Sequence, residues 1–232
     1  MAQKSKFFES DHDWDQVLID GAGGSFTRGQ ILKYYQKHAS RMMPWLRQHH
    51  ALLLIGLNED DYVIKRNHAG SQIFIEKEKG IDYPQSFEYW IYRRAVAFHM
   101  TIGPTTNRGW VDVDIHSSDA AQQKKLFNQA KKMIPAISKA LKKISPATIS
   151  TWKSGGTGIH IMAMYNKKLN TDQLRRELKS NLDQIIQDDN VVTGRAQLGQ
   201  IRLDTSTLTN QGSIRCPWSL SLDGFAKIPL KL

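Results

Sequence analysis

The order of secondary-structure patterns in the second half of the chain restricts its fold more than any other feature. Six patterns follow one another as strand, helix, strand, strand, helix and strand, at residues 109–115, 119–144, 148–152, 159–165, 171–188 and 199–204. Short apolar runs or alternation with a period of two mark the strands, and apolar residues every three or four positions mark the helices. Such a series is typical of a split βαβ, or ferredoxin-like, sheet. We therefore predict an α+β fold.

The first hundred residues carry a second series of patterns. We predict a helix with Thr27 as its N-cap that runs to Trp45, with Pro44 ending or kinking it. Three strands and then one aromatic-rich helix are predicted at residues 51–57, 62–65, 73–77 and 87–96. The aromatic side chains of that helix are expected mostly in the core, and base stacking by one of them is the alternative.

The chain length of 232 residues suits one domain or two closely packed lobes, and it is enough to bury a hydrophobic core. We divide the chain into an N-terminal α/β module of residues 1–105 and a C-terminal module of residues 106–232. The last two predicted strands, 218–222 and 225–230, are joined by an Asp-Gly pair, which is a favoured hairpin turn.

Composition narrows the class of protein. Lys and Arg total 32 against 22 Asp and Glu, a formal net charge of +10. This charge points towards a polyanionic partner such as nucleic acid, with a basic but uninvolved surface as the equal alternative. No apolar run is long enough to span a bilayer, and residues 1–15 lack the apolar core of a secretory signal. We therefore expect a cytoplasmic, nucleoid-associated protein with no membrane partner. A single cysteine, Cys216, excludes an intramolecular disulfide and a cysteine-based zinc finger.

Two aspartates alternate with apolar residues on the strand predicted at 109–115. Because side chains at i and i+2 of a strand point to the same face, Asp112 and Asp114 should lie side by side. Their repulsion would raise one pKa, and a divalent cation would relieve that repulsion. Mg²⁺ and Mn²⁺ prefer such oxygen ligands and bridge to substrate phosphates. The alternative is an exposed strand whose acids are simply solvated.

A turn between two predicted strands contains three glycines, in the sequence KSGGTGIH. Glycines there let backbone N–H groups approach an anion closely. Lys153, Ser154 and Thr157 add donors, and His160 begins the next strand. The residue order differs from that of a Walker A loop. The turn therefore predicts a phosphate site, with a flexible hairpin turn as the alternative.

A third acid stands at the end of the strand predicted at 199–204. Asp204 would add a carboxylate if this strand lies beside the first acidic strand. Arg202 lies on the same strand face and would pair with Asp204 or with a phosphate; an ordinary surface ion pair is the alternative. Clustered acids, a glycine turn and a basic surface together form the set required for nucleotidyl transfer, in which two metal ions align a 3′-OH and a leaving pyrophosphate.

These motifs, in this order, resemble those of the archaeo-eukaryotic primase superfamily. Its members carry an acidic DxD pair, an SxH-type motif and a late third aspartate, which match DVD, SGGTGIH and RLD here. Residues 201–230 resemble the corresponding part of primase small, catalytic subunits. FTRGQILKYYQKHASRMMPWL, at residues 26–46, resembles the start of the polymerase domain of bacterial ligase D. The resemblance spans residues 17–230.

The resemblance implies roles for the matching residues. Asp112, Asp114 and Asp204 would ligate two catalytic Mg²⁺ or Mn²⁺ ions, and no zinc is expected. With the donors named above, the predicted contacts to the incoming nucleotide are Ser154, Gly155, Gly156, Thr157, His160, Lys153, Arg202, Arg215 and His99. In the N-terminal module, Lys65 and Arg66 would contact DNA.

The same resemblance implies a two-lobed α+β primase-polymerase core, with the N-terminal α/β module packed on a C-terminal RRM-like catalytic sheet. Its activity would be template-directed addition of NTPs or dNTPs to the 3′-OH of a DNA primer. Gap filling or end-joining repair is the expected setting, with ribonucleotides favoured. A ligase, or another end-joining or replication partner, would then be a separate protein.

Three other functions remain open at this stage. A primase that starts chains without a primer would use the same acids, but primase subunits usually carry a zinc-binding cysteine cluster that this sequence does not have. A non-catalytic nucleic-acid-binding module would gain nothing from clustered carboxylates. A metal-dependent nuclease would use the acids for hydrolysis, although the glycine turn favours a triphosphate substrate.

The helix predicted at 119–144 is rich in lysine. Its lysines mostly avoid the apolar positions, such as Leu126, Ile134 and Leu141. A solvated helix face is the simplest interpretation, and contact with a DNA backbone is the alternative. Pro135 predicts a kink in this helix or its division into two.

Overall fold

The computed structural model describes residues 28–46, 51–58, 61–66, 91, 95–155, 157–220 and 227–230. The chain divides into two compact units. Unit 1 comprises Met1–Thr101 with Ile214–Ile228, and unit 2 comprises Ile102–Ser213 with Pro229–Leu232. The first boundary lies close to the sequence-based one at residue 105. The second assigns 214–228, a segment of the predicted C-terminal module, to unit 1.

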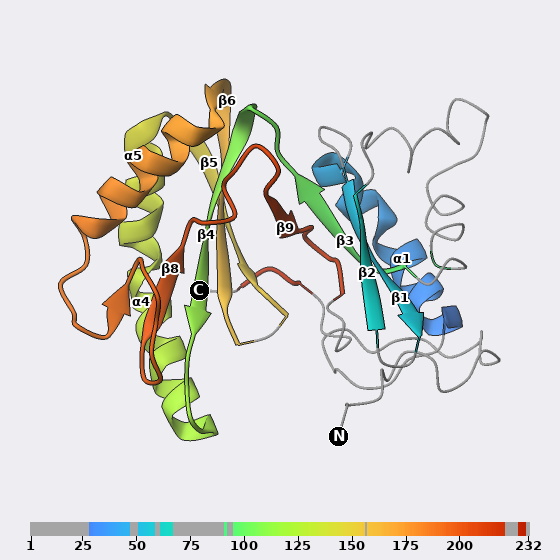
Figure 1. Cartoon of the computed structure of the whole chain (residues 1–232), viewed down its shortest axis with the longest axis horizontal. Helices are drawn as coiled ribbons and strands as arrows, with labels where there is room; N and C mark the ends of the chain where they lie inside the picture. The colour runs from blue at the N-terminus through green and yellow to red at the C-terminus, as the bar shows by residue number, and fades with distance from the viewer. Residues whose placement is uncertain are drawn as a thin grey trace. The chain divides into compact units, whose positions relative to one another are not determined.

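Unit 2 has the predicted element order. Its elements are β4 (Thr105–Ile115), α4 (Ala120–Ile144), β5 (Ala147–Lys153), β6 (Ile159–Asn170), α5 (Thr171–Asp183), β7 (Val191–Val192) and β8 (Ile201–Asp204). The sheet order is β5-β6-β4-β8-β7, and the first four strands pair antiparallel (Figure 1). β6 separates β4 from β5, as in a split βαβ unit. Together with the second sheet, this confirms the predicted α+β class.

Strand β4 sorts its side chains between the two faces of this sheet. Val111 and Val113 are fully buried, whereas Asp112 and Asp114 are half-exposed. The apolar face packs against α4, whose buried positions are Leu126, Ala130, Ile134, Ile137, Ala140 and Leu141. The apolar face that the period of two gives the strand therefore packs in one core with the apolar face that the period near 3.6 gives the helix.

Helix α4 begins where the sequence predicts. The Asp119 carboxylate accepts the backbone N–H of Gln122 at 2.8 Å and so caps the helix. The helix continues past Pro135 to Ile144, so the structure favours one helix over the predicted division into two. Pro135 lies on the exposed side.

Helix α5 differs from the prediction at both ends. The sequence predicts Thr171 as the N-cap of this helix. In the structure Asn170 is the N-cap, and its side-chain oxygen accepts the backbone N–H of Gln173 at 3.0 Å. Thr171 is fully buried, with its hydroxyl donating to the backbone oxygen of Gly103. Because that tertiary bond occupies Thr171, the preceding residue caps the helix. The helix ends at Asp183, earlier than the predicted residue 188.

Among its described residues, unit 1 contains helix α1 (Arg28–Leu46), a helical residue at Ile91 and a four-stranded sheet. The strands are β1 (Ala51–Asn58), β2 (Asp61–Arg66), β3 (Ala95–Thr101) and β9 (Ser213–Arg215), with the strand order β2-β1-β3-β9. Helix α1 runs through Pro44, and Tyr34 and Tyr35 are buried in the core as their helical spacing predicts.

Three predictions for unit 1 are corrected or lie outside the described residues. Ala95 and Val96 belong to strand β3, not to the end of the helix predicted at 87–96. Short apolar runs suit either element, and here pairing with β1 decides in favour of the strand. The strand predicted at 73–77 and the N-cap Thr27 lie outside the described residues.

The C-terminal segment makes backbone contacts within unit 1 and then, from Pro229, within unit 2. The backbone N–H of Trp218 donates to the oxygen of Lys227 at 2.7 Å, and the N–H of Lys227 donates to the oxygen of Ser219 at 2.9 Å. The two arms of the predicted hairpin therefore meet, while its turn residues lie outside the described part. Pro229 then forms a bridge with Trp152 of β5. Among the described helices, none is long and apolar enough to cross a membrane.

Candidate functional site

Two adjacent strands of unit 2 bring the predicted acids into one row, and a third strand adds His160 beside them. Asp112 on β4 is the register partner of Asp204 on β8 and of His160 on β6. Asp114 is the register partner of Arg202. Cross-strand partners point to the same face of a sheet, so all five side chains lie on the face opposite α4. We call Asp112, Asp114 and Asp204 the acid row.

Two of the three acids are held by basic neighbours. His160 Nε2 lies 3.2 Å from Asp112 Oδ1, and Arg202 Nη2 lies 3.0 Å from Asp204 Oδ2. The other oxygen of Asp204 accepts the backbone N–H of Ser206 at 2.7 Å. These contacts fix the orientation of Asp204 from both sides.

The surroundings of Asp114 disfavour the ionised form of its carboxyl group. Burial is the largest cause that raises its pKa, and the charges of Asp112 and Asp204 raise it further. Arg202 lowers it in part, and the resulting pKa is about 7. A carboxyl group with that pKa is half-protonated at neutral pH unless positive charge is added nearby. The acid row is therefore short of positive charge despite Arg202 and His160.

The donor set suits a divalent cation that also binds a substrate. Within the described part of the chain, no three His, Cys, Asp or Glu side chains form a ready-made metal cage. Mg²⁺ does not require one, because proteins usually hold it through one or two carboxylates while substrate phosphates and water fill the other positions. The carboxylates and the raised pKa of Asp114 fit that chemistry.

The glycine turn after β5 is tightly closed. The backbone N–H of Ser154 donates to the oxygen of Gly158 at 3.0 Å, and the N–H of Gly158 donates to Ser154 Oγ at 3.1 Å. Gly155 has a φ of 84°, and a Cβ at Gly158 would lie 2.6 Å from the backbone oxygen of Val113. Both positions therefore require glycine. Gly156 lies outside the described residues.

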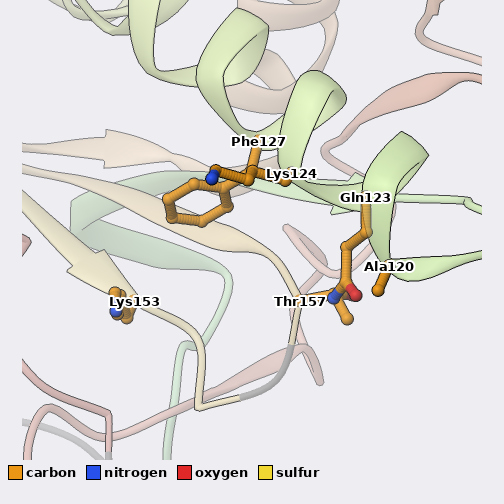
Figure 2. A pocket seen from close by; sticks show the side chains of 6 residues that line it. All are labelled: Ala120, Gln123, Lys124, Phe127, Lys153 and Thr157. Carbon is orange, nitrogen blue, oxygen red and sulfur yellow. The ribbon is translucent and has the colours of Figure 1, made fainter.

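Two residues predicted for the same phosphate site face the other way. Lys153 is the register partner of Ile159, which in turn pairs with Val113 on the helix-facing side of the sheet. Lys153 and Thr157 line a recess with four residues of α4 (Figure 2). The structure therefore groups His160 with the acid row and places Lys153 on the opposite face of the sheet.

The remaining predicted residues belong to unit 1. His99 lies on β3, and Arg215 lies on the neighbouring strand β9. In the backbone register, Leu52 pairs with both Arg66 and His99, and Leu53 likewise links Lys65 to Phe98. The sheet of unit 1 thus places Arg66 and His99 in one register row and Lys65 in the next, and the roles of these residues stay predictions.

Sequence reasoning did not single out Trp218. Among the described non-glycine residues, it alone has a positive φ, 67°, which is strained for a bulky side chain. Its ring stacks on His38 at a centroid distance of 5.0 Å, and the Arg41 guanidinium lies 4.7 Å from the ring centroid. Tyr34 donates to its backbone oxygen at 2.8 Å. Only the neighbouring Pro217 hints at an unusual backbone here.

A comparison with solved structures identifies a protein of similar fold. The polymerase domain of Mycobacterium tuberculosis ligase D, solved in complex with DNA, matches with a TM-score of 0.67 at 15% sequence identity. The match covers 93% of this chain and 87% of that one. The chain shares the fold of that polymerase domain. No family model and no curated protein sequence matches the chain.

Proposed function

We propose that this protein is a metal-dependent, template-directed nucleotidyltransferase that adds NTPs or dNTPs to the 3′-OH of a DNA primer. One observation carries the proposal: the adjacent strands β4 and β8 of unit 2 gather Asp112, Asp114 and Asp204 in one row, with Asp114 at a pKa of about 7. The similarity in fold to a polymerase domain solved with DNA supports it. Gap filling or end-joining repair, with ribonucleotides favoured, is the proposed setting.

The acid row would hold Mg²⁺ or Mn²⁺ together with the nucleotide's phosphates. When bound, the cation supplies positive charge to the developing alkoxide and to the leaving pyrophosphate. His160 holds Asp112, and the Ser206 backbone N–H holds Asp204. Arg202 is placed to exchange its contact with Asp204 for one with a phosphate oxygen.

The glycine turn would contribute a fixed edge to the nucleotide site. Ser154 is buried beside the start of β6, two strands from β8, and its hydrogen bonds with Gly158 hold the two ends of the turn together. Such a fixed turn loses little entropy when an anion binds. Arg215 and His99 stay proposed nucleotide contacts, and Lys65 and Arg66 stay proposed DNA contacts.

A purely DNA-binding module is the main competing function. That alternative does not account for the acid row, because carboxylates repel the phosphate backbone and would weaken DNA binding. A primer-independent primase uses the same chemistry and differs only in its need for a primer. The proposed partners are a DNA template and primer, and a separate ligase or replication protein would act on the product.

Extension of a labelled primer on gapped DNA tests the proposal. With Mn²⁺ and either NTPs or dNTPs, wild-type protein should add nucleotides, and Asp112→Ala/Asp114→Ala should add none. Asp188→Ala/Asp189→Ala removes the same charge from two exposed turn residues and should extend like wild type. Product without a primer would favour a primase. Intact DNA binding without nucleotide addition under any condition would contradict the proposal.

A further inference from the structure

A recess opens on the helix side of the unit 2 sheet, between the first turns of α4 and the turn that follows β5. Its volume is about 250 Å³, and it is lined by Ala120, Gln123, Lys124, Phe127, Lys153 and Thr157. Figure 2 shows Lys124 and Phe127 on the helix, with Lys153 and Thr157 on the strand and turn below it. We call this the α4 recess.

The α4 recess is separate from the acid row. Lys153 shares a register row with Ile159 and Val113, whose side chains are fully buried on the helix side. The acids belong to the alternate positions of the same strands and therefore face the other way. A ligand in the recess would not occupy the proposed catalytic site.

The chemistry of the α4 recess matches one nucleotide. All six lining residues are cationic or uncharged, and Lys124 and Lys153 supply two exposed ammonium groups. Phe127 is only half-buried, so it offers an aromatic surface on which a base can stack. Gln123 and Thr157 add an amide and a hydroxyl for the polar edge of a base.

Helix α4 extends the positive charge away from the recess. It carries seven lysines and no acidic residue between Ala120 and Ile144. Six of these lysines are exposed, and the seventh, Lys131, is half-exposed. Lys131 follows Lys124 by two turns, about 10 Å along the axis, on nearly the same side of the helix. A strand leaving the recess would therefore meet further cations.

We propose that the α4 recess binds one unpaired nucleotide of single-stranded DNA, with its base on Phe127 and its phosphates at Lys124 and Lys153. The neighbouring strand follows the lysines of α4. A single strand is the occupant because an unstacked base alone presents its ring face to an aromatic side chain. The inference rests on the proposed function for the identity of the polyanion as DNA, and it adds a second DNA contact that leaves the acid row accessible.

The test is binding of fluorescein-labelled oligothymidylate by fluorescence anisotropy, in EDTA and without nucleotide. Phe127→Leu keeps an apolar side chain of similar reach but removes the ring, and it should weaken binding about five-fold or more. Lys124→Gln/Lys153→Gln removes two phosphate contacts. Its slope of log affinity against log salt should therefore be shallower by about 1.4.

A matched control removes the same charge elsewhere. Lys167→Gln/Lys168→Gln changes two exposed lysines near the far end of β6, about 25 Å along the strand from the glycine turn. This variant should leave the affinity within about two-fold and the salt slope unchanged. Thermal unfolding of each variant separates lost binding from lost folding.

The outcomes keep this inference distinct from the proposed function. Equal affinities for the recess variants and the control would overturn the inference, whatever the polymerase assay shows. Weakening by the lysine pair with no effect of Phe127→Leu would also overturn it, because the surface would then attract any polyanion. Recess-dependent binding by a protein that adds no nucleotide would support the inference and contradict the proposed function.

Discussion

The two faces of the unit 2 sheet use the same strands for opposite chemistry. One face carries the acid row, in which Asp114 has a pKa of about 7 because burial and the charges of Asp112 and Asp204 oppose its ionisation. The other face is apolar at Val113 and is covered by a helix with seven lysines and no acid. The alternation of a strand thus keeps the acids apart from the lysines of α4, so that those lysines do not neutralise the acid row proposed to bind a cation.

The largest expected effect is on the acid face. Asp204→Asn keeps the size of the side chain and an oxygen that can accept the Ser206 N–H, but it removes the charge. Nucleotide addition should fall by about a hundred-fold or more, as it does when a group that stabilises transition-state charge is removed. Single-turnover extension of a labelled primer measures the loss. Asp188→Asn, in an exposed turn, is the control, and an equal loss in both variants would refute the special role of Asp204.

The next largest effect is expected in the glycine turn between β5 and β6. Gly158→Ala places a Cβ 2.6 Å from the backbone oxygen of Val113, so the turn must shift. We expect a loss of about 2 kcal/mol in the free energy of unfolding, and reduced extension. Gly103→Ala meets no atom within 4 Å and should change stability by less than about 0.5 kcal/mol. Denaturant unfolding of both variants tests this difference, and equal stabilities would refute the close packing of the turn.

The pKa of Asp114 predicts an unusual pH dependence of stability without metal. Its folded pKa is about 7, above the ordinary value of 3.8, so between these values the native state keeps a proton that the unfolded state releases. Stability should therefore fall as pH rises from 4 to 7. In EDTA, Asp114→Asn should lose less stability than wild type over this range. Thermal unfolding at pH 4 and pH 8 measures both, and parallel changes in the two proteins would contradict the electrostatic account.

The smallest expected effect is on the helix face. Lys139 has Lys143 four residues ahead on the exposed side of α4, so Lys139→Gln should stabilise the protein by about 0.3 kcal/mol at low salt. Lys179→Gln should destabilise it by a similar amount, because it breaks the exposed pair with Asp183 at 2.7 Å. Both effects should vanish at high salt. The same sign in both variants, measured by denaturant unfolding, would contradict a self-repelling helix face.

The arrangement of the acid row can be predicted from the spacing of residues along one strand and from the order of the secondary-structure elements. The spacing of Asp112 and Asp114 fixes their common face, and the order of elements after residue 109 predicts the sheet that places Asp204 beside them. The raised pKa of Asp114 follows from its burial and, in part, from the neighbouring charges of Asp112 and Asp204, and of these causes the sequence predicts the charge of Asp112.

Other features depend on contacts between distant residues. Lys153 and His160 flank the same turn, but only the register of β5 against β6 shows that they face opposite sides of the sheet. Asn170 and Thr171 both suit an N-cap, and the burial of Thr171 decides between them. The positive φ of Trp218 likewise depends on its packing with α1 and has no clear sequence signal.

The most direct test of the division between the two faces is Mn²⁺ binding followed by electron paramagnetic resonance, which detects the free ion. With a nucleoside triphosphate present, wild-type protein should remove more Mn²⁺ from solution than the triphosphate does alone. Asp112→Asn/Asp114→Asn should abolish that excess, whereas Lys124→Gln/Lys153→Gln should preserve it. Equal Mn²⁺ binding by wild type and the acid-row variant would contradict the assignment of this face to a metal-bound triphosphate.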